Sequence, residues 1–187
     1  RPRFRNYPVQ KSRRRMSIDQ FLHLGMRALK NGDAERAAEV FHHFNDLRPA
    51  DARGYVGLAL LAKRRWALDR ACDLSRKAVL LQPKKLRICI GHATACADNL
   101  DIDEALRMMA RALVIQPNDA DLRTHLGLLH LRAGDWSRGF AFYDYRGSRR
   151  ALLAQLKKFN ISPWQGESLA DKHIVLAGEQ GAGDVLQ

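Results

Sequence analysis

Three residues that could bind a soft metal ion, Cys89, His92 and Cys96, follow one another at helical spacing. Intervals of three and four residues place their side chains on one face of a helix, and thiolate and imidazole groups are ligands that Zn²⁺ prefers. The packing face of an ordinary helix has the same spacing, and no fourth ligand is evident nearby. We therefore expect no metal site and no cofactor, and interpret the three residues as packing residues.

Four further histidines show no arrangement for nucleophilic catalysis. His42 and His43 are adjacent, and His125 and His130 lie on one expected helix. No Ser, Cys or Asp stands near them at a spacing that would predict a catalytic triad. We expect these histidines to pack or to face solvent, and we expect no catalysis by this chain alone.

The cysteines also bear on the compartment. There are three of them, an odd number, and all lie within expected helices: Cys72, Cys89 and Cys96. Buried thiols behave as small apolar groups, and an odd number does not indicate a disulfide framework. No apolar run approaches the roughly 18 residues that a membrane span needs. The sequence therefore predicts reduced cysteines in a cytoplasmic protein.

The elements that position these residues recur every 34 residues. Pro49, Pro83 and Pro117 mark the period. Each proline would end a helix because it cannot donate the i→i−4 hydrogen bond. Small residues recur at the eighth and twentieth positions, where they would let two helices approach closely. The expected repeats are 18–51, 52–85, 86–119 and, less regularly, 120–148.

Turn residues divide the repeats into pairs of helices. The turns are marked by Asn31-Gly32-Asp33, by Asp98-Asn99-Leu100-Asp101 and by Ala133-Gly134-Asp135. Aspartate at the end of such a turn would cap the helix that follows. Trp66 and Trp136 also stand at turns into second helices, and we expect both to be packing anchors.

The 34-residue pattern resembles the tetratricopeptide repeat (TPR), a pair of helices that stacks into an array. The eighth position of the four repeats holds Gly25, Ala59, Ala93 and Gly127. The resemblance implies an all-α fold, a right-handed solenoid over 17–148, in place of an ordinary helical bundle. It also implies protein binding.

TPR arrays usually present the first helix of each repeat on a concave face, and this resemblance implies a partner groove here. Its expected lining is an apolar stripe flanked by arginines, suited to an apolar segment with acidic residues or to a second copy of the chain. The chain's own N-terminal segment is an alternative occupant. The expected groove residues are Leu22, Met26, Leu29, Arg53, Val56, Leu60, Arg64, Arg87, Ile90, Thr94, Thr124, Leu128 and Arg132.

Much of the net charge of +12 lies in a basic N-terminal segment, residues 1–16. Its first 15 residues hold seven of the 32 Lys and Arg residues and no acid. Such a segment could bind phosphate groups or anionic lipid, or it could be a solvated linker. No recognised nucleic-acid module follows, so we favour the linker and do not expect nucleic acid as a partner.

The period fails after Arg146, and the composition changes. Residues 149–159 indicate a helix that would cap the array, and 160–173 indicate a linker. Residues 174–187 combine a short apolar run with a Gly-rich turn, which predicts the first strand of a truncated α/β domain. Because one strand has no ladder partner, we expect it to be disordered or to pair with another chain.

Three strings in this part of the chain carry a second resemblance. They are Gly134-Asp-Trp-Ser-Arg-Gly-Phe-Ala-Phe-Tyr-Asp-Tyr-Arg146, Pro163-Trp-Gln-Gly166 and Glu179-Gln-Gly-Ala-Gly-Asp-Val-Leu-Gln187. Together they resemble bacterial TPR proteins fused to a GT-B glycosyltransferase domain related to the heptosyltransferases. In a complete protein the resemblance implies Asp184 as catalytic base, and Gly181 and Gly183 as the turn that approaches a nucleotide sugar.

Two functions follow from the sequence. The first is a protein-interaction scaffold without catalysis. The second is the acceptor-recruiting N-terminal part of a bacterial glycosyltransferase whose catalytic domain lies elsewhere in a longer protein.

Overall fold

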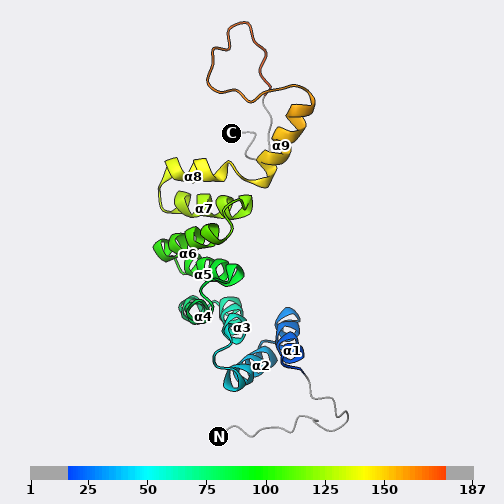
Figure 1. Cartoon of the computed structure of the whole chain (residues 1–187), viewed down its shortest axis with the longest axis vertical. Helices are drawn as coiled ribbons and strands as arrows, with labels where there is room; N and C mark the ends of the chain where they lie inside the picture. Colours follow the sequence, from blue (N-terminus) through cyan, green and yellow to red (C-terminus); the bar gives the residue numbers. More distant parts are fainter. Residues whose placement is uncertain (1–16, 176–187) are drawn as a thin grey trace. The chain divides into compact units, whose positions relative to one another are not determined.

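The computed structural model describes residues 17–175, and all regular secondary structure in that part of the chain is helical (Figure 1). The expected all-α class is thereby confirmed. The chain divides into two compact units between Pro83 and Lys84. The first unit holds α1 (Ile18–Lys30), α2 (Ala34–Leu47), α3 (Ala52–Arg64) and α4 (Leu68–Leu81). The second holds α5 (Leu86–Asp98), α6 (Ile102–Ile115), α7 (Ala120–Arg132), α8 (Trp136–Tyr143) and α9 (Gly147–Lys158).

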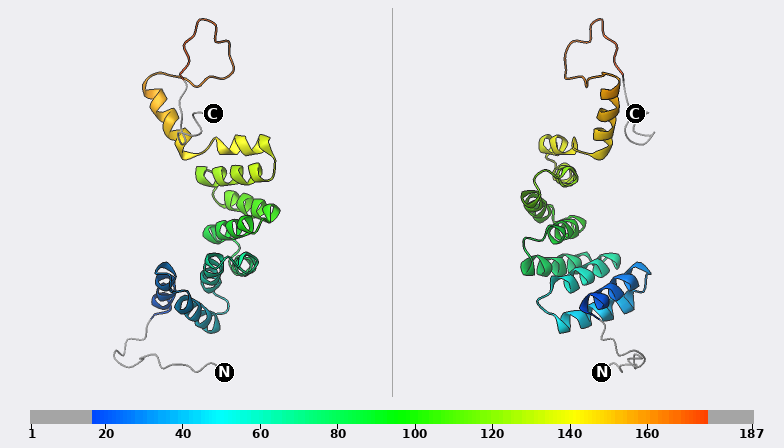
Figure 2. Two further views of the ribbon diagram at one scale, coloured as in Figure 1. Left: turned by 180° about the vertical axis from the view of Figure 1, so that it is seen from behind. Right: turned by 45° about the vertical axis from the view of Figure 1, so that its right-hand side comes forward.

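Helices α1 to α8 form four helical hairpins, one in each expected repeat. Within each hairpin the two helices pack along one another, as α7 and α8 do in Figure 2. Helix α2 also packs on α3, and α6 packs on α7, so each hairpin inside a unit contacts the next. The aspartates expected to cap second helices do so. Asp33, Asp101 and Asp135 accept hydrogen bonds from the backbone N–H three residues on, at 3.1, 3.2 and 3.1 Å.

The turn inside every hairpin contains one residue with a left-handed backbone. It is the fifteenth position of each repeat, and φ is 81° at Gly32, 57° at Trp66, 63° at Leu100 and 78° at Gly134. Glycine adopts this region freely, whereas other residues do so at a cost of about 1–2 kcal/mol. The expectation that Trp66 is a packing anchor is wrong, because its side chain is 83% exposed. The left-handed turn directs it into solvent.

The core of each hairpin depends on the small residues of the repeat. At the twentieth position Ala37, Ala71, Ala105 and Gly139 are all buried. In the first unit the ring of Phe41 occupies the space beside Gly25 and Gly57, and the ring of Phe44 occupies that beside Gly54; neither ring has exposed surface. In the second unit the backbones come closest at Gly127, where an added Cβ would lie 2.6 Å from the backbone nitrogen of Tyr143. The close approach of α7 to α8 therefore requires glycine there.

The C-terminal part of the chain differs from expectation. Helix α9 forms close to the predicted range 149–159, but none of its residues is buried, so it does not seal the array with an apolar face. Of the expected strand, only Ile174 and Val175 belong to the described chain, and neither has regular structure. The remainder of that prediction lies outside the described residues.

Candidate interaction surface

In the first unit, α1 and α3 lie against each other and present an apolar face. The fifth and ninth positions of the two repeats supply it: Leu22 and Met26 from α1, and Val56 and Leu60 from α3. Met26 and Leu60 are exposed, and the other two are half-buried, with Leu22 packed against the core. These four predicted groove residues therefore form one accessible patch, which we call the α1–α3 face.

Leu29 does not belong to this face. Its side chain is only 5% exposed and packs in the core with Phe41 and Leu58. The twelfth position of a repeat lies between the exposed and the buried sides of the helix, and in α1 it turns inward. The backbone carbonyl of Leu29, in the last turn of α1, nevertheless accepts a hydrogen bond from Arg64.

Two of the predicted groove arginines hold the ends of neighbouring helices. Arg64 of α3 donates to the carbonyl oxygen of Leu29 in α1. In the second unit, Arg132 of α7 donates to the carbonyl oxygen of Ala97 in α5 at 2.9 Å. Both acceptors belong to the last turn of a helix, where carbonyl groups lack intrahelical donors and favour a cation. Arg64 and Arg132 therefore connect consecutive repeats.

Arg53 is also engaged within the chain. Its guanidinium lies 2.5 Å from Asp19 and 2.7 Å from Asp51, the residue that precedes α3. The hydrogen bond to Asp51, and then the one to Asp19, raise the pKa of Arg53, and the same bond lowers the pKa of Asp51. The contact with Asp19 spans one repeat and is exposed to solvent.

The corresponding face of the second unit is more polar. Ile90 is half-buried and Leu128 is exposed, while the two threonines turn their hydroxyl groups onto their own helices. Thr94 donates to the carbonyl of Ile90 at 2.9 Å, and Thr124 donates to that of Ala120 at 2.8 Å. Arg87 is exposed and, within the described chain, makes no hydrogen bond or ion pair. Of the four predicted groove arginines it is the one that has no such contact within the described chain.

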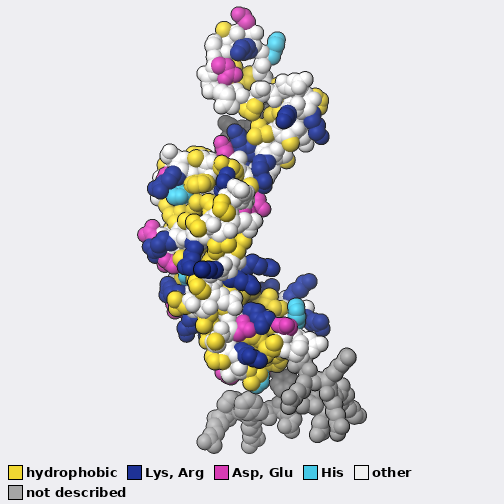
Figure 3. All heavy atoms as spheres, viewed as in Figure 1, with side chains coloured by type: hydrophobic (Ala, Val, Ile, Leu, Met, Phe, Trp, Pro, Cys, Tyr) yellow, Lys and Arg dark blue, Asp and Glu magenta, His cyan; other side chains and the backbone are white. Residues whose placement is uncertain are grey.

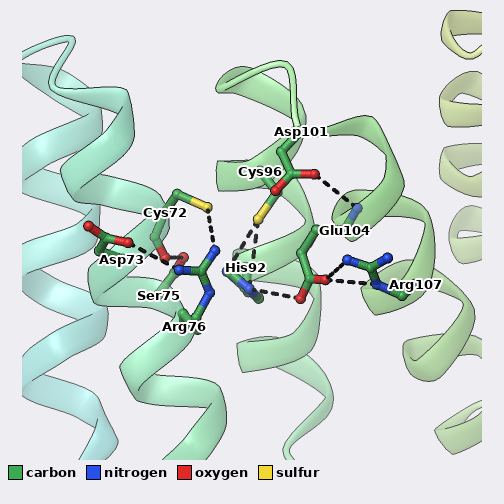
Figure 4. Close-up of polar contacts among 9 residues, drawn as sticks. All are labelled: Cys72, Asp73, Ser75, Arg76, His92, Cys96, Asp101, Glu104 and Arg107. Atoms are coloured by element: carbon green, nitrogen blue, oxygen red, sulfur yellow. Dashed lines mark hydrogen bonds and ion pairs between the residues drawn. The ribbon is translucent and has the colours of Figure 1, made fainter.

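The candidate metal ligands Cys89, His92 and Cys96 are buried, and Figure 4 shows the polar contacts of the last two. In α5, the Sγ of Cys96 lies 3.5 Å from Nδ1 of His92, and Nε2 of His92 lies 3.4 Å from a carboxylate oxygen of Glu104 in α6. Arg107 holds the other oxygen of that carboxylate at 2.5 Å. Cys89 is fully buried, and burial raises the pKa of its thiol. Among the described residues, no group of three close ligands includes Cys89, so the predicted set is not brought together.

Sequence reasoning missed an aromatic pair on α8. Trp136 and Phe140 are 62% and 58% exposed, and their rings stack with centroids 6.3 Å apart. They hold the seventeenth and twenty-first positions of the last repeat, which in α6 are the half-buried Ile102 and Leu106. Figure 3 shows hydrophobic side chains at the surface over α7 and α8. The expectation that Trp136 anchors packing is therefore wrong. Its position in the last repeat could have indicated this, because no further repeat follows to cover that side of α8.

A mixed-charge cleft of about 620 Å³ also opens in the first unit, between α2 and α4. Asp46 lines it from α2, and Arg70, Asp73 and Lys77 line it from α4. Its charges balance, so it favours no single sign of ligand. The remaining two predicted site features, Asp184 and the turn at Gly181 and Gly183, lie outside the described residues.

No protein-family model matches the sequence, and no curated protein matches it. The fold is nevertheless similar to solved TPR proteins. A crystal structure of MamA aligns with a TM-score of 0.63 at 16% identity, over 72% of this chain and 73% of that chain. A second MamA structure gives 0.62 at 18% identity, over 78% and 82%. PilF of Pseudomonas aeruginosa gives 0.63 at 17% identity, over 76% and 70%.

These similarities, with the four hairpins, identify the fold as an all-α TPR solenoid. At such low identity they establish the fold alone. In the described part of the chain, no helix combines the length and the apolar character that crossing a membrane would need.

Proposed function

We propose that the chain is a binding scaffold that holds a protein segment on the first helices of its repeats, without catalysis of its own. The α1–α3 face is the observation that carries this proposal. Four apolar side chains lie together on two contacting helices; Met26 and Leu60 are 41% and 39% exposed, and Leu22 and Val56 are half-buried. Covering such a surface is favourable by about 25 cal/mol per Å² of apolar area. An amphipathic or extended segment with apolar anchors would supply that cover.

The charges on the first helices refine the partner's chemistry. Arg64 and Arg132 are committed to helix ends, and Arg53 has two carboxylates of its own. Because the Arg53–Asp19 pair is exposed, it contributes little to stability, and a partner carboxylate could replace Asp19. Arg87 offers a second cation in the other unit. The partner segment is therefore mainly apolar and carries a few acidic residues.

Selection of displayed random peptides on the immobilised chain tests this proposal. The enriched peptides should combine apolar residues with Asp or Glu. In calorimetry, Leu60→Asp should weaken their binding at least about tenfold, because it places a charge in the centre of the α1–α3 face. The matched control is Leu81→Asp, at a leucine of α4 that is 38% exposed against 39% for Leu60. Equal affinity of the two variants, or enrichment of basic peptides, would refute the proposed face.

A second function concerns a longer protein. The string Glu179-Gln-Gly-Ala-Gly-Asp184 favours it, through its resemblance to the first turn of heptosyltransferase-like domains. In that protein the TPR array would present an acceptor to the transferase domain. Calorimetry with nucleotide sugars should then show no binding to this chain and clear binding to the longer protein. Asp184→Asn in the longer protein should abolish sugar transfer while leaving nucleotide-sugar binding intact.

A further inference from the structure

Helix α9 lacks the packed apolar face that holds the other helices in place. Each of α1 to α8 has at least one buried residue, whereas α9 has none. It is attached to its unit by ion pairs near its N-terminus. Arg149 lies 3.3 Å from Asp144, and Arg150 lies 3.3 Å from Asp121. Exposed ion pairs of this kind contribute about 0–1 kcal/mol each to stability. These two pairs therefore add little to the attachment of α9.

The side chains of α9 separate into two faces. At about 100° per residue, Leu152, Leu153 and Leu156 fall within one third of the helix circumference, and Phe159 continues that stripe beyond the last turn. The three leucines are half-buried, and Phe159 is 74% exposed. The helix is therefore amphipathic, with a stripe that nothing in the unit fully covers.

The charge around this stripe has one sign. Residues 146–165 contain five bases and no acid. Lys158 lies on the side of the helix opposite Leu153 and Leu156, and Lys157 lies at the edge of the apolar stripe, next to Leu153. Within the described chain neither lysine has an ion-pair partner. A basic helix with an uncovered apolar stripe complements a surface that is anionic outside and apolar beneath.

The segment after α9 extends the same chemistry. Ile161 and Trp164 are exposed, and the Nε1 of Trp164 donates to the carbonyl of Glu167 at 2.8 Å. Tryptophan is favoured at membrane interfaces because its large apolar ring carries one polar group. The apolar residues therefore continue from a helix onto an irregular segment. That distribution suits a lipid surface better than a protein groove, which would hold one regular stripe.

We propose that α9, together with the segment up to Trp164, binds the surface of an anionic lipid bilayer. The helix lies in the plane of the interface, with Leu153, Leu156 and Phe159 among the upper acyl chains. Lys157 and Lys158 remain at the level of the anionic headgroups. This activity is independent of the α1–α3 face and leaves that face free for a partner.

Co-sedimentation of the whole chain with vesicles tests the proposal. The chain should bind vesicles of phosphatidylcholine with about 30 mol% phosphatidylglycerol, and should bind pure phosphatidylcholine far more weakly. The double variant Lys157→Glu/Lys158→Glu should lose at least about tenfold in binding to the anionic vesicles. The matched control is Lys84→Glu/Lys85→Glu, which makes the same charge change at two adjacent exposed lysines. Circular dichroism should confirm that both variants keep their helices.

A second readout separates insertion from simple charge attraction. In a Trp66→Phe/Trp136→Phe variant, Trp164 is the only tryptophan. Its fluorescence emission maximum should shift to shorter wavelength when the protein binds anionic vesicles. Leu153→Ser/Leu156→Ser should remove that shift. Equal vesicle binding by Lys157→Glu/Lys158→Glu and Lys84→Glu/Lys85→Glu would overturn the proposal, because the net charge of the chain, and not α9, would then cause the binding. An unshifted Trp164 spectrum, or protection of α9 only in a complex with another protein, would overturn it as well.

Discussion

The first and last helices of the TPR array end it in opposite ways. At the third and tenth positions of their repeats, α3 buries Gly54 and Leu61, and α7 buries Leu122 and Leu129. In α1 the same positions hold Gln20 and Arg27, both exposed. The side chain of Gln20 also accepts from the backbone of Ser17 at 2.8 Å and completes a capping box. The outer side of α1 therefore carries polar side chains, and the N-terminus of the helix is capped.

The other end carries aromatic residues where a following helix would pack. Trp136 and Phe140 remain exposed on α8, and α9 does not cover them. A solenoid needs polar outer faces at its ends to stay soluble, and an uncovered aromatic pair marks a surface that is completed by something else. The two ends therefore differ in what they expose: α1 presents polar side chains at positions that are buried in α3 and α7, whereas α8 presents an aromatic pair.

The largest expected effect contrasts phenylalanines from the two ends. Phe41→Ala should lower the free energy of unfolding by about 3–5 kcal/mol, because its ring is fully buried between α1, α2 and α3. Phe140→Ala should change it by less than about 0.5 kcal/mol. Urea unfolding followed by circular dichroism measures both. A large loss in Phe140→Ala would mean that α8 is covered after all.

A glycine pair tests how tightly the last hairpin is packed. Gly127→Ala should destabilise the second unit by about 1–3 kcal/mol, because the new methyl group would meet the backbone of α8. Gly91→Ala on α5 has open space around the added carbon and should stabilise by about 0.5–1 kcal/mol. Thermal unfolding of the two variants should shift in opposite directions. The same sign for both would show that α8 can move away from α7.

The arginine links between repeats should have an intermediate effect. Arg132→Met keeps most of the side chain's length but removes the guanidinium donor to the carbonyl of Ala97, which keeps only backbone donors, at a cost of about 1 kcal/mol. Arg64→Met should cost a similar amount in the first unit. Hydrogen exchange should quicken in the last turns of α5 and α1, respectively. Unchanged exchange in both would show that these bonds do not hold the helix ends.

The smallest expected effect is a pH dependence confined to the C-terminal end. His130 stacks on Phe142, and burial, followed by Arg138, lowers its pKa below the ordinary 6.5, while Asp135 opposes this. Between the two pKa values the unfolded chain binds more protons than the folded one, so stability is present above pH 6.5 and is lost as the pH falls. His130→Phe should weaken this dependence. An identical pH profile for His130→Phe would assign the loss to other groups.

The sequence predicted those features that depend on a residue's own conformation or size. Prolines stop helices, aspartates cap them, and small residues mark close packing, so Pro83, Asp33 and Ala37 could be placed without coordinates. The acceptor of Arg64 could not be predicted, because a carbonyl group at a helix end leaves no trace in the residue type. Leu29 was assigned to the wrong side because the twelfth position lies near the boundary of the two faces. Trp66 was misplaced because its type suggested burial, whereas the left-handed turn exposes it.

The two arginine links also define a larger unit of construction. They stand 68 residues apart, at Arg64 and Arg132, while the same position of the other two repeats holds Lys30 and Asp98. The chain is in this respect a duplicated module of two repeats, and the boundary between its compact units falls between the copies. Anyone recombining these repeats into new arrays should exchange them in pairs, cutting between Pro83 and Lys84, so that each pair keeps its own link.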